Sequence, residues 1–240
     1  DELKESIKRF ISNNQFYSGR KTVGMQDKSK IKSPNIHYKP EDINRWLQNP
    51  VQNEERLRTL SNYLYNTNAL YKWVINTIAL MPKYNWSLTQ NSLTNKKSKS
   101  QRKNSYYEAL EYVDKLNLQH ELIKVFLIML KEDWYYGYEI ESEDNYFILH
   151  LDAKYCKPSS RNGDGTYNFK FDFNYFKDKE DLLATYPNEF KIKYELSKSN
   201  KNNWIELDAN KTICLKFNDE FEYAMPYYAV LFSSLLSLDY

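Results

Sequence analysis

Residues 167–173 have the sequence Tyr-Asn-Phe-Lys-Phe-Asp-Phe, in which aromatic and polar side chains alternate. Successive side chains of a β-strand point to opposite faces of the sheet, so the aromatic residues would share one face and Asn168, Lys170 and Asp172 the other. The Gly-Asp-Gly sequence at 163–165 is typical of a turn between two hairpin strands. The stretch therefore predicts an antiparallel strand with one buried face.

The rest of the C-terminal half has the same character. Five further short segments are rich in aromatic and β-branched residues and predict strands. They are residues 135–141, 146–151, 155–157, 204–207 and 212–217. Short helices are predicted over 178–186 and 188–197, and Pro226 precedes a final apolar segment, residues 227–238, that also predicts a helix.

The N-terminal half predicts helices. Pro40-Glu41-Asp42 opens a helix that would end near Asn49-Pro50, since proline and carboxylates favour a first turn. Residues 53–80 predict one long helix. Its apolar stripe comprises Leu57, Leu60, Leu64, Tyr71, Ile75 and Ile78. Trp73 and Val74 widen the apolar surface, which favours burial of this helix on two sides.

Two more helices are predicted over residues 105–116 and 118–133, and the second is apolar almost all round, as a core helix would be. The predicted fold class is therefore α+β, a helical layer followed by a mostly antiparallel, aromatic-rich β region. We divide the chain into residues 1–40 (a helix at 2–12 and an extended arm), 41–133 (helical) and 134–240 (β-rich, with a terminal helix).

Composition excludes several classes of protein. Of the 240 residues, 41% are hydrophobic and 28% charged, which fits a soluble globular chain, and no apolar run approaches the about 18 residues of a membrane helix. The spacing of the five glycines matches neither a dinucleotide-binding motif nor a P-loop motif. Cys156 and Cys214 are expected to be free thiols. The chain opens Asp-Glu-Leu-Lys without an initiator Met, which suggests a fragment or processed form.

Charge is unevenly distributed. The formal net charge is +2, but residues 1–120 carry +9 and residues 121–240 carry −7. The asymmetry indicates either nucleic-acid contact or oppositely charged faces that meet within the fold or between subunits. The only dense basic run falls in a predicted loop, residues 91–104. Its candidate DNA or partner contacts are Lys96, Lys97, Lys99, Arg102 and Lys103. A solvated loop is the alternative.

Motifs for catalysis or metal binding are weak. His37, His120 and His150 are scattered, and His150 lies two residues from Asp152 without a nucleophile motif. Two cysteines 58 residues apart give no zinc spacing. A calcium loop over 160–171 fails because Phe171 stands where a bidentate glutamate is needed. We therefore predict no catalytic residue, no metal ligand and no cofactor.

Two alternatives stay open. The carboxylate pairs Glu139 with Glu141 and Asp178 with Asp181 could belong to a nuclease or glycosidase, whose sites assemble in space. Aromatic residues of the β region could stack on single-stranded bases, although core packing is favoured because this half is acidic. Those aromatic residues are Tyr135, Tyr136, Tyr138, Phe169, Phe171 and Phe173.

The order of several stretches resembles portal proteins of tailed bacteriophages, in particular a family from phages of low-GC Gram-positive bacteria. The stretches span most of residues 40–240. They are Ile78-Ala-Leu-Met-Pro-Lys-Tyr-Asn-Trp, Asp133-Trp-Tyr-Tyr-Gly-Tyr-Glu, Leu151-Asp-Ala-Lys-Tyr-Cys-Lys, the aromatic strand at 167–173, Trp204-Ile-Glu-Leu-Asp and Met225-Pro. None of these stretches carries a mechanism, so the resemblance depends on their order.

The resemblance implies a non-enzymatic ring, usually a dodecamer, at one capsid vertex, through which double-stranded DNA is packaged and ejected. It further implies assembly in the host cytoplasm, location in the virion, and contacts with the terminase large subunit, capsid proteins and head–tail adaptors, without a membrane. This chain would supply mostly the wing, with the terminal helix leading toward a stem that is missing here. The alternatives are a phage or mobile-element nucleic-acid-binding protein and a metal-dependent nuclease.

Overall fold

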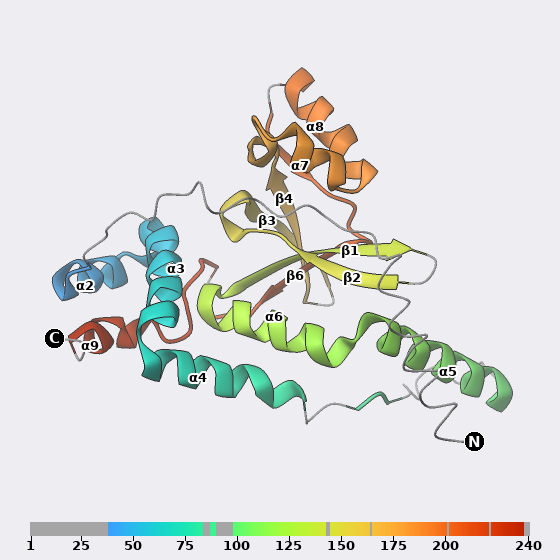
Figure 1. Ribbon diagram of the computed structural model, residues 1–240, viewed down its shortest axis with the longest axis horizontal. Coiled ribbons are helices and arrows are strands. Elements are labelled where there is room, and N and C mark those ends of the chain that lie inside the picture. The colour runs from blue at the N-terminus through green and yellow to red at the C-terminus, as the bar shows by residue number, and fades with distance from the viewer. Residues whose placement is uncertain are drawn as a thin grey trace.

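The computed structural model describes residues 38–83, 87–89, 98–142, 145–163, 165–200, 202–220 and 222–237. The α+β class is confirmed, with helices first and two three-stranded antiparallel sheets after them (Figure 1). The helix predicted at 2–12 and the arm up to residue 37 lie outside the described residues.

The helical layer begins with α2 (Pro40–Gln48), α3 (Pro50–Thr67) and α4 (Ala69–Leu80), and a short 3-10 turn, η3 (Met81–Lys83), follows. The prediction of one long helix over 53–80 is wrong. Asn68 has extended backbone angles, and its side chain accepts a hydrogen bond from Tyr71 N, so it caps α4. Capping by a short amide side chain competes with helix continuation, which breaks the helix in two.

Helices α5 (Lys99–Leu116) and α6 (Leu118–Glu132) meet at Asn117, whose left-handed backbone (φ 51°) turns the chain. Helix α5 begins six residues before the predicted start at 105, because Ser98 and Gln101 form a capping box. Helix α6 lies between α4 and the first sheet, as expected of a core helix (Figure 1). It is not buried all round, since Leu122 and Ile128 are only half-buried.

The first sheet has the order β2-β1-β6 and consists of β1 (Trp134–Ser142), β2 (Asn145–His150) and β6 (Thr212–Lys216). Gly137 pairs with His150 on one side and with Ile213 on the other. A Cβ atom at Gly137 would lie 2.7 Å from Ile148 Cγ2 and 2.9 Å from Tyr135 Cε1, so the centre of β1 requires glycine.

The second sheet has the order β3-β4-β5 and consists of β3 (Cys156–Arg161), β4 (Tyr167–Asp172) and β5 (Trp204–Glu206). A 3-10 turn, η4 (Ala153–Tyr155), leads into β3. The predicted alternation in β4 is confirmed, because Phe169 and Phe171 are buried while the polar residues between them are not. Strands β3 and β4 form the expected hairpin.

Beyond β4 the chain forms η5 (Phe173–Phe176), α7 (Glu180–Thr185) and α8 (Asn188–Asn200). Their aromatic side chains pack edge to face with those of β1 and β4; Phe190, for example, lies 5.0 Å from Tyr138 between ring centroids. The six aromatic residues that could have stacked on bases are all buried. They fill the protein core, as favoured from the sequence.

The last segment forms η6 (Ala229–Leu231) and α9 (Phe232–Ser237) instead of one helix over 227–238. Helix α9 packs back on the helical layer, where Phe232 meets Tyr71 at 5.8 Å between ring centroids. The predicted boundary at residue 134 thus marks where strands begin, but the C-terminal helix shares its hydrophobic core with α2, α3 and α4.

Candidate functional site

The basic run lies partly in helix α5. Lys96 and Lys97 lie outside the described residues, whereas Lys99 opens α5 and Arg102 and Lys103 follow in its first turns. The expected loop over 91–104 is therefore wrong from Lys99 onward, because the capping box begins the helix there. We call Lys99, Arg102, Lys103 and Tyr107 the basic end of α5.

An aromatic ring lies beside Lys103. Lys103 Nζ lies 5.7 Å from the ring centroid of Tyr107, a side chain that is largely exposed. A cation and an exposed aromatic ring on the first turns of a helix can bind phosphate and stack on a base. This geometry is therefore compatible with nucleic-acid binding at the basic end of α5.

The carboxylates of β1 are engaged with tyrosines. Tyr112 on α5 donates a hydrogen bond to Glu139, and Tyr146 on β2 donates one to Glu141 at 2.9 Å. The two tyrosine rings also contact each other at 4.8 Å between centroids. The contacts of Tyr112 tie α5 to the first sheet. They were not predicted, because Tyr112 and Glu139 are 27 residues apart and leave no local signal.

The second carboxylate pair lies on the surface around the start of α7. Asp178 and Asp181 are both exposed, Asp178 with a left-handed backbone (φ 59°) and Asp181 in the first turn of α7. Among the residues that the structure describes, no group of three or more His, Cys, Asp or Glu side chains could hold a metal ion.

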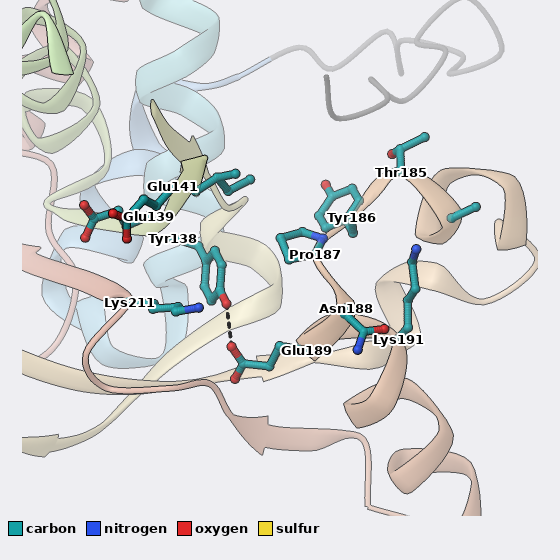
Figure 2. Close-up of a pocket in the computed structure, with 12 residues that line it drawn as sticks. Tyr138, Glu139, Glu141, Thr185, Tyr186, Pro187, Asn188, Glu189, Lys191 and Lys211 are labelled. Atoms are coloured by element: carbon teal, nitrogen blue, oxygen red, sulfur yellow. Dashed lines mark hydrogen bonds between the residues drawn. The ribbon is translucent and has the colours of Figure 1, made fainter. Parts of the chain in front are cut away.

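A cleft of about 490 Å³ lies between the end of β1 and the junction of α7 with α8 (Figure 2). Tyr138 and Glu189 both line the cleft, and Tyr138 donates a hydrogen bond of 2.5 Å to Glu189 Oε2. Glu189 Oε1 accepts bonds of 2.7 Å from Asp208 N and from Lys193 Nζ. Both carboxylate oxygens of Glu189 are therefore used in fixing α8 to β1 and to the chain after β5.

The protonation of Glu189 follows from these contacts. Burial raises the pKa of Glu189, but the hydrogen bonds from Lys193, Tyr138 and Asp208 N outweigh burial, so the pKa is lowered. An ionised carboxylate that already accepts three hydrogen bonds is a poor general base. We interpret the contacts of Glu189 at this cleft as structural, because they hold α8 against β1. We call these contacts the clamp in the cleft.

The remaining candidates contact neighbouring parts of the fold. Asp152 accepts a hydrogen bond from Lys154 N and caps η4, whereas the His150 ring stacks on Tyr135 at 5.5 Å between centroids. Cys156 and Cys214 are buried free thiols of the same hydrophobic cluster. Burial raises the pKa of Cys214 to about 12 and also that of Cys156, so both thiols stay protonated at neutral pH.

A buried carboxylate that the sequence did not single out as a site residue also accepts several hydrogen bonds. Asp133, between α6 and β1, forms a buried ion pair with Lys216 of β6. Its carboxylate also accepts hydrogen bonds from Asn218 N at 3.0 Å and Met225 N at 3.1 Å. Asp133 thereby joins the helical layer, the first sheet and the segment that leads to α9.

Comparisons with known proteins gave no match: no protein-family model, no curated protein and no solved structure matches this chain. Helices within the described ranges are all too short or too polar to cross a membrane.

Proposed function

We propose that this chain is the wing part of a portal protein of a tailed bacteriophage. Copies of it would form a closed ring, of about twelve subunits, at one capsid vertex, and double-stranded DNA would pass through the ring during packaging and ejection. The partners would be the terminase large subunit, capsid proteins and head–tail adaptors, and the assembled protein would be part of the virion.

The observation that carries the proposal is the bond between Asp133 and Met225 N, at 3.1 Å. These two residues open two of the stretches on which the resemblance to portal proteins rests, and they are 92 residues apart in the chain. The stretch that begins at Leu151 is also close by, since Leu151 N donates to Tyr136 O at 2.9 Å. Three of these stretches, which begin at Asp133, Leu151 and Met225, thus meet at one junction of the fold.

The contacts of four carboxylates also support a structural role for this chain. Glu139, Glu141, Glu189 and Asp133 all hold one element against another through hydrogen bonds. Side chains with this role stabilise a rigid subunit, which is what a ring under mechanical load requires.

Native mass spectrometry of the full-length polypeptide tests this function. We expect one closed assembly of uniform subunit number, near twelve, at micromolar concentration. A strictly monomeric protein across the accessible concentration range would overturn the proposal.

A nucleic-acid-binding protein is the second candidate, favoured by the basic end of α5. The double variant Arg102→Gln, Lys103→Gln should then weaken binding to duplex DNA and lower the slope of log affinity against log salt by about 2, because each phosphate contact contributes about 0.9. The matched control is Lys177→Gln, Lys211→Gln, which removes two exposed cations elsewhere. Equal slopes for both double variants would exclude DNA contact at this surface.

A further inference from the structure

Strand β1 has one open edge over its last residues. Its pairing with β2 continues to Ser142, whereas its pairing with β6 ends at Tyr138. Beyond that point the edge makes one further bond, from Glu139 N to Lys211 O at 2.7 Å. Residues 140–142 therefore have a neighbouring strand on one side only within the described part of the chain.

The open edge presents the backbone of Glu141. In an antiparallel sheet the N–H and C=O groups of one residue point to the same side, and successive residues alternate between the two sides. Glu139 N points toward β6, so the N–H and C=O of Glu141 point to the same, open side. An edge with such groups can pair with an added strand from another chain.

The cleft of about 490 Å³ lies along this edge (Figure 2). It is lined on one side by residues 138–141 of β1 and on the other by residues 184–189. Lys211, which directly precedes β6, also lines the cleft. The cleft therefore lies where β6 would continue if it were longer, and it leaves room for an extended segment beside Glu141.

The charges at this edge differ between the two faces of the sheet. Figure 2 shows the carboxylates of Glu139 and Glu141 on the side of β1 away from the junction of α7 with α8. Each accepts a hydrogen bond from a tyrosine, but neither forms an ion pair with a lysine or arginine that the structure describes.

The other face of the cleft carries cations instead. Lys191 of α8 lines it, and Lys211 lies at its end beside β6. Opposite charges on neighbouring strands stabilise a sheet, and like charges destabilise it. An added strand is therefore favoured if it has cations on the face of Glu139 and Glu141 and no cation on the face toward α8.

One segment of this chain has that pattern. Residues 28–33 have the sequence Lys-Ser-Lys-Ile-Lys-Ser, so a strand would carry three lysines on one face and serine and isoleucine on the other. It is the only place in the sequence where three lysines or arginines recur at every second position. The run at 96–103 has adjacent cations, which would fall on both faces.

The geometry favours a second copy as the source of this segment. The described chain begins at Tyr38, whose ring lies 5.1 Å from that of Tyr63 of α3 between centroids. The five residues between Ser33 and Tyr38 span at most about 18 Å. From Trp134 to Glu141, β1 alone extends about 23 Å, and α2 and α3 lie beyond its first residues (Figure 1).

We propose that residues 28–33 of one copy of this chain add as a strand to the open edge of β1 in a neighbouring copy. The added backbone pairs with the N–H and C=O of Glu141, and its lysines lie beside Glu139 and Glu141. The inference rests on the assembly of copies proposed above and names a contact that links them. Each copy gives one segment and receives another, so the contact is heterologous, as a closed ring requires.

Two charge-reversed variants disable the two sides of this contact. The segment variant carries Lys28→Glu, Lys30→Glu and Lys32→Glu, and the edge variant carries Glu139→Lys and Glu141→Lys. Each alone should weaken association of the full-length protein by about 30-fold or more in sedimentation velocity, because like charges then face each other.

The matched control carries Lys4→Glu, Lys8→Glu and Arg9→Glu. It changes the net charge of the same N-terminal region by the same amount, but these residues do not recur at every second position. Association of the control should equal that of the wild type. A loss as large as that of the segment variant would show that net charge alone matters and would overturn the inference.

Mixing the segment variant with the edge variant tests the pairing itself. In the mixture the introduced glutamates of one variant meet the introduced lysines of the other, and the unchanged segment of the edge variant meets the unchanged edge of the segment variant. The mixture should therefore recover the assembly of the wild type. Two folded variants that stay dispersed when mixed at high micromolar concentration would contradict the pairing.

Hydrogen exchange tests the added strand directly. The amide of Glu141 should exchange about 10-fold or more slowly in the assembled wild type than in the segment variant, because its N–H is bonded only when the strand is added. Equal exchange rates at Glu141 in the two proteins would overturn the inference, whatever the charge changes do to assembly.

The outcomes also separate this inference from the ring. Rings that form unchanged in the segment variant would overturn this contact and leave the portal proposal standing, whereas a monomeric wild-type protein would overturn both. Slow exchange at Glu141 in such a monomer, lost in the segment variant, would show that the same copy supplies the strand.

Discussion

Asp133 and Lys216 form an ion pair from which water is almost excluded, since each side chain exposes only 1% of its surface. They are 83 residues apart in the chain. Glu54 of α3 interacts electrostatically with both, and burial raises the pKa of Glu54 while a hydrogen bond from the backbone of Ala224 opposes this. One cluster of charges therefore joins α3, the start of β1, the end of β6 and the segment before α9.

Asp133→Asn should destabilise the protein by about 3–5 kcal/mol, because it leaves the Lys216 ammonium buried without a counter-charge. Lys216→Met should cost less, since the Asp133 carboxylate keeps its hydrogen bonds from Asn218 N and Met225 N. Urea denaturation of both variants and of the double variant measures these differences. Additive losses in the double variant would contradict a direct pair.

Gly137→Ala should destabilise by about 1–3 kcal/mol, because the added methyl group has no room beside Ile148 and Tyr135. Gly163→Ala serves as the control, since nothing lies within 4 Å of a Cβ atom there. Thermal unfolding followed by circular dichroism compares the two. Equal unfolding temperatures for the two variants would show that the first sheet does not pack tightly at this point.

We expect the ionisation of Tyr71 to lower the free energy of unfolding at alkaline pH. Burial raises the pKa of Tyr71 to about 12, although its 2.8 Å hydrogen bond with Ser61 opposes the shift. The folded state thus keeps this proton above pH 10, where the unfolded chain loses it, so the stabilisation is full below pH 10 and is lost as pH rises toward 12. The loss amounts to about 2–3 kcal/mol.

Tyr71→Phe tests this dependence. Near pH 8 it should be less stable than wild type by about 1 kcal/mol, because it leaves Ser61 without this partner. Since phenylalanine does not ionise, the order should reverse by about pH 11.5. Denaturant unfolding at the two pH values gives the comparison. A difference in the free energy of unfolding that is the same at both pH values would contradict the raised pKa of Tyr71.

Glu189→Gln should cost about 1–3 kcal/mol at pH 7, because it weakens the bonds from Tyr138, Lys193 and Asp208 N. The lowered pKa of Glu189 means that its contribution is present above the ordinary value of 4.5 and is lost as pH falls through the folded-state value. The gap between wild type and variant should therefore shrink in acid.

Glu195→Gln on the same helix is the control for this experiment, because the Glu195 side chain is 70% exposed and its ion pair with Lys198 contributes little. Denaturant unfolding at neutral and acidic pH gives both comparisons. If Glu189→Gln behaves like Glu195→Gln at neutral pH, the clamp in the cleft has no energetic role.

Local patterns predicted much of the fold. The alternation at residues 167–173 gave β4 and its buried face, since period-two burial is a property of adjacent residues. The break at Asn68 and the early start of α5 were missed because a single capping side chain outweighed the pattern around it. Ser98-x-x-Gln101 was a readable signal for the second of these.

Contacts between residues that are far apart in the sequence could not be predicted from local patterns. The partners of Asp133 and the tyrosine that binds Glu139 are set by how sheets and helices pack, and nothing near these residues in sequence specifies them. The exposed side of α4 shows the same limit. Its composition predicted burial on two sides, but Leu70, Trp73 and Leu80 are exposed within the described part of the chain, because a local pattern does not specify which sides of a helix the rest of the fold covers.

Electron microscopy of single particles of the full-length polypeptide tests the central claim most directly. The account predicts closed rings of about twelve copies around a central channel. Dispersed monomers at every concentration, or dimers related by a two-fold axis, would contradict it.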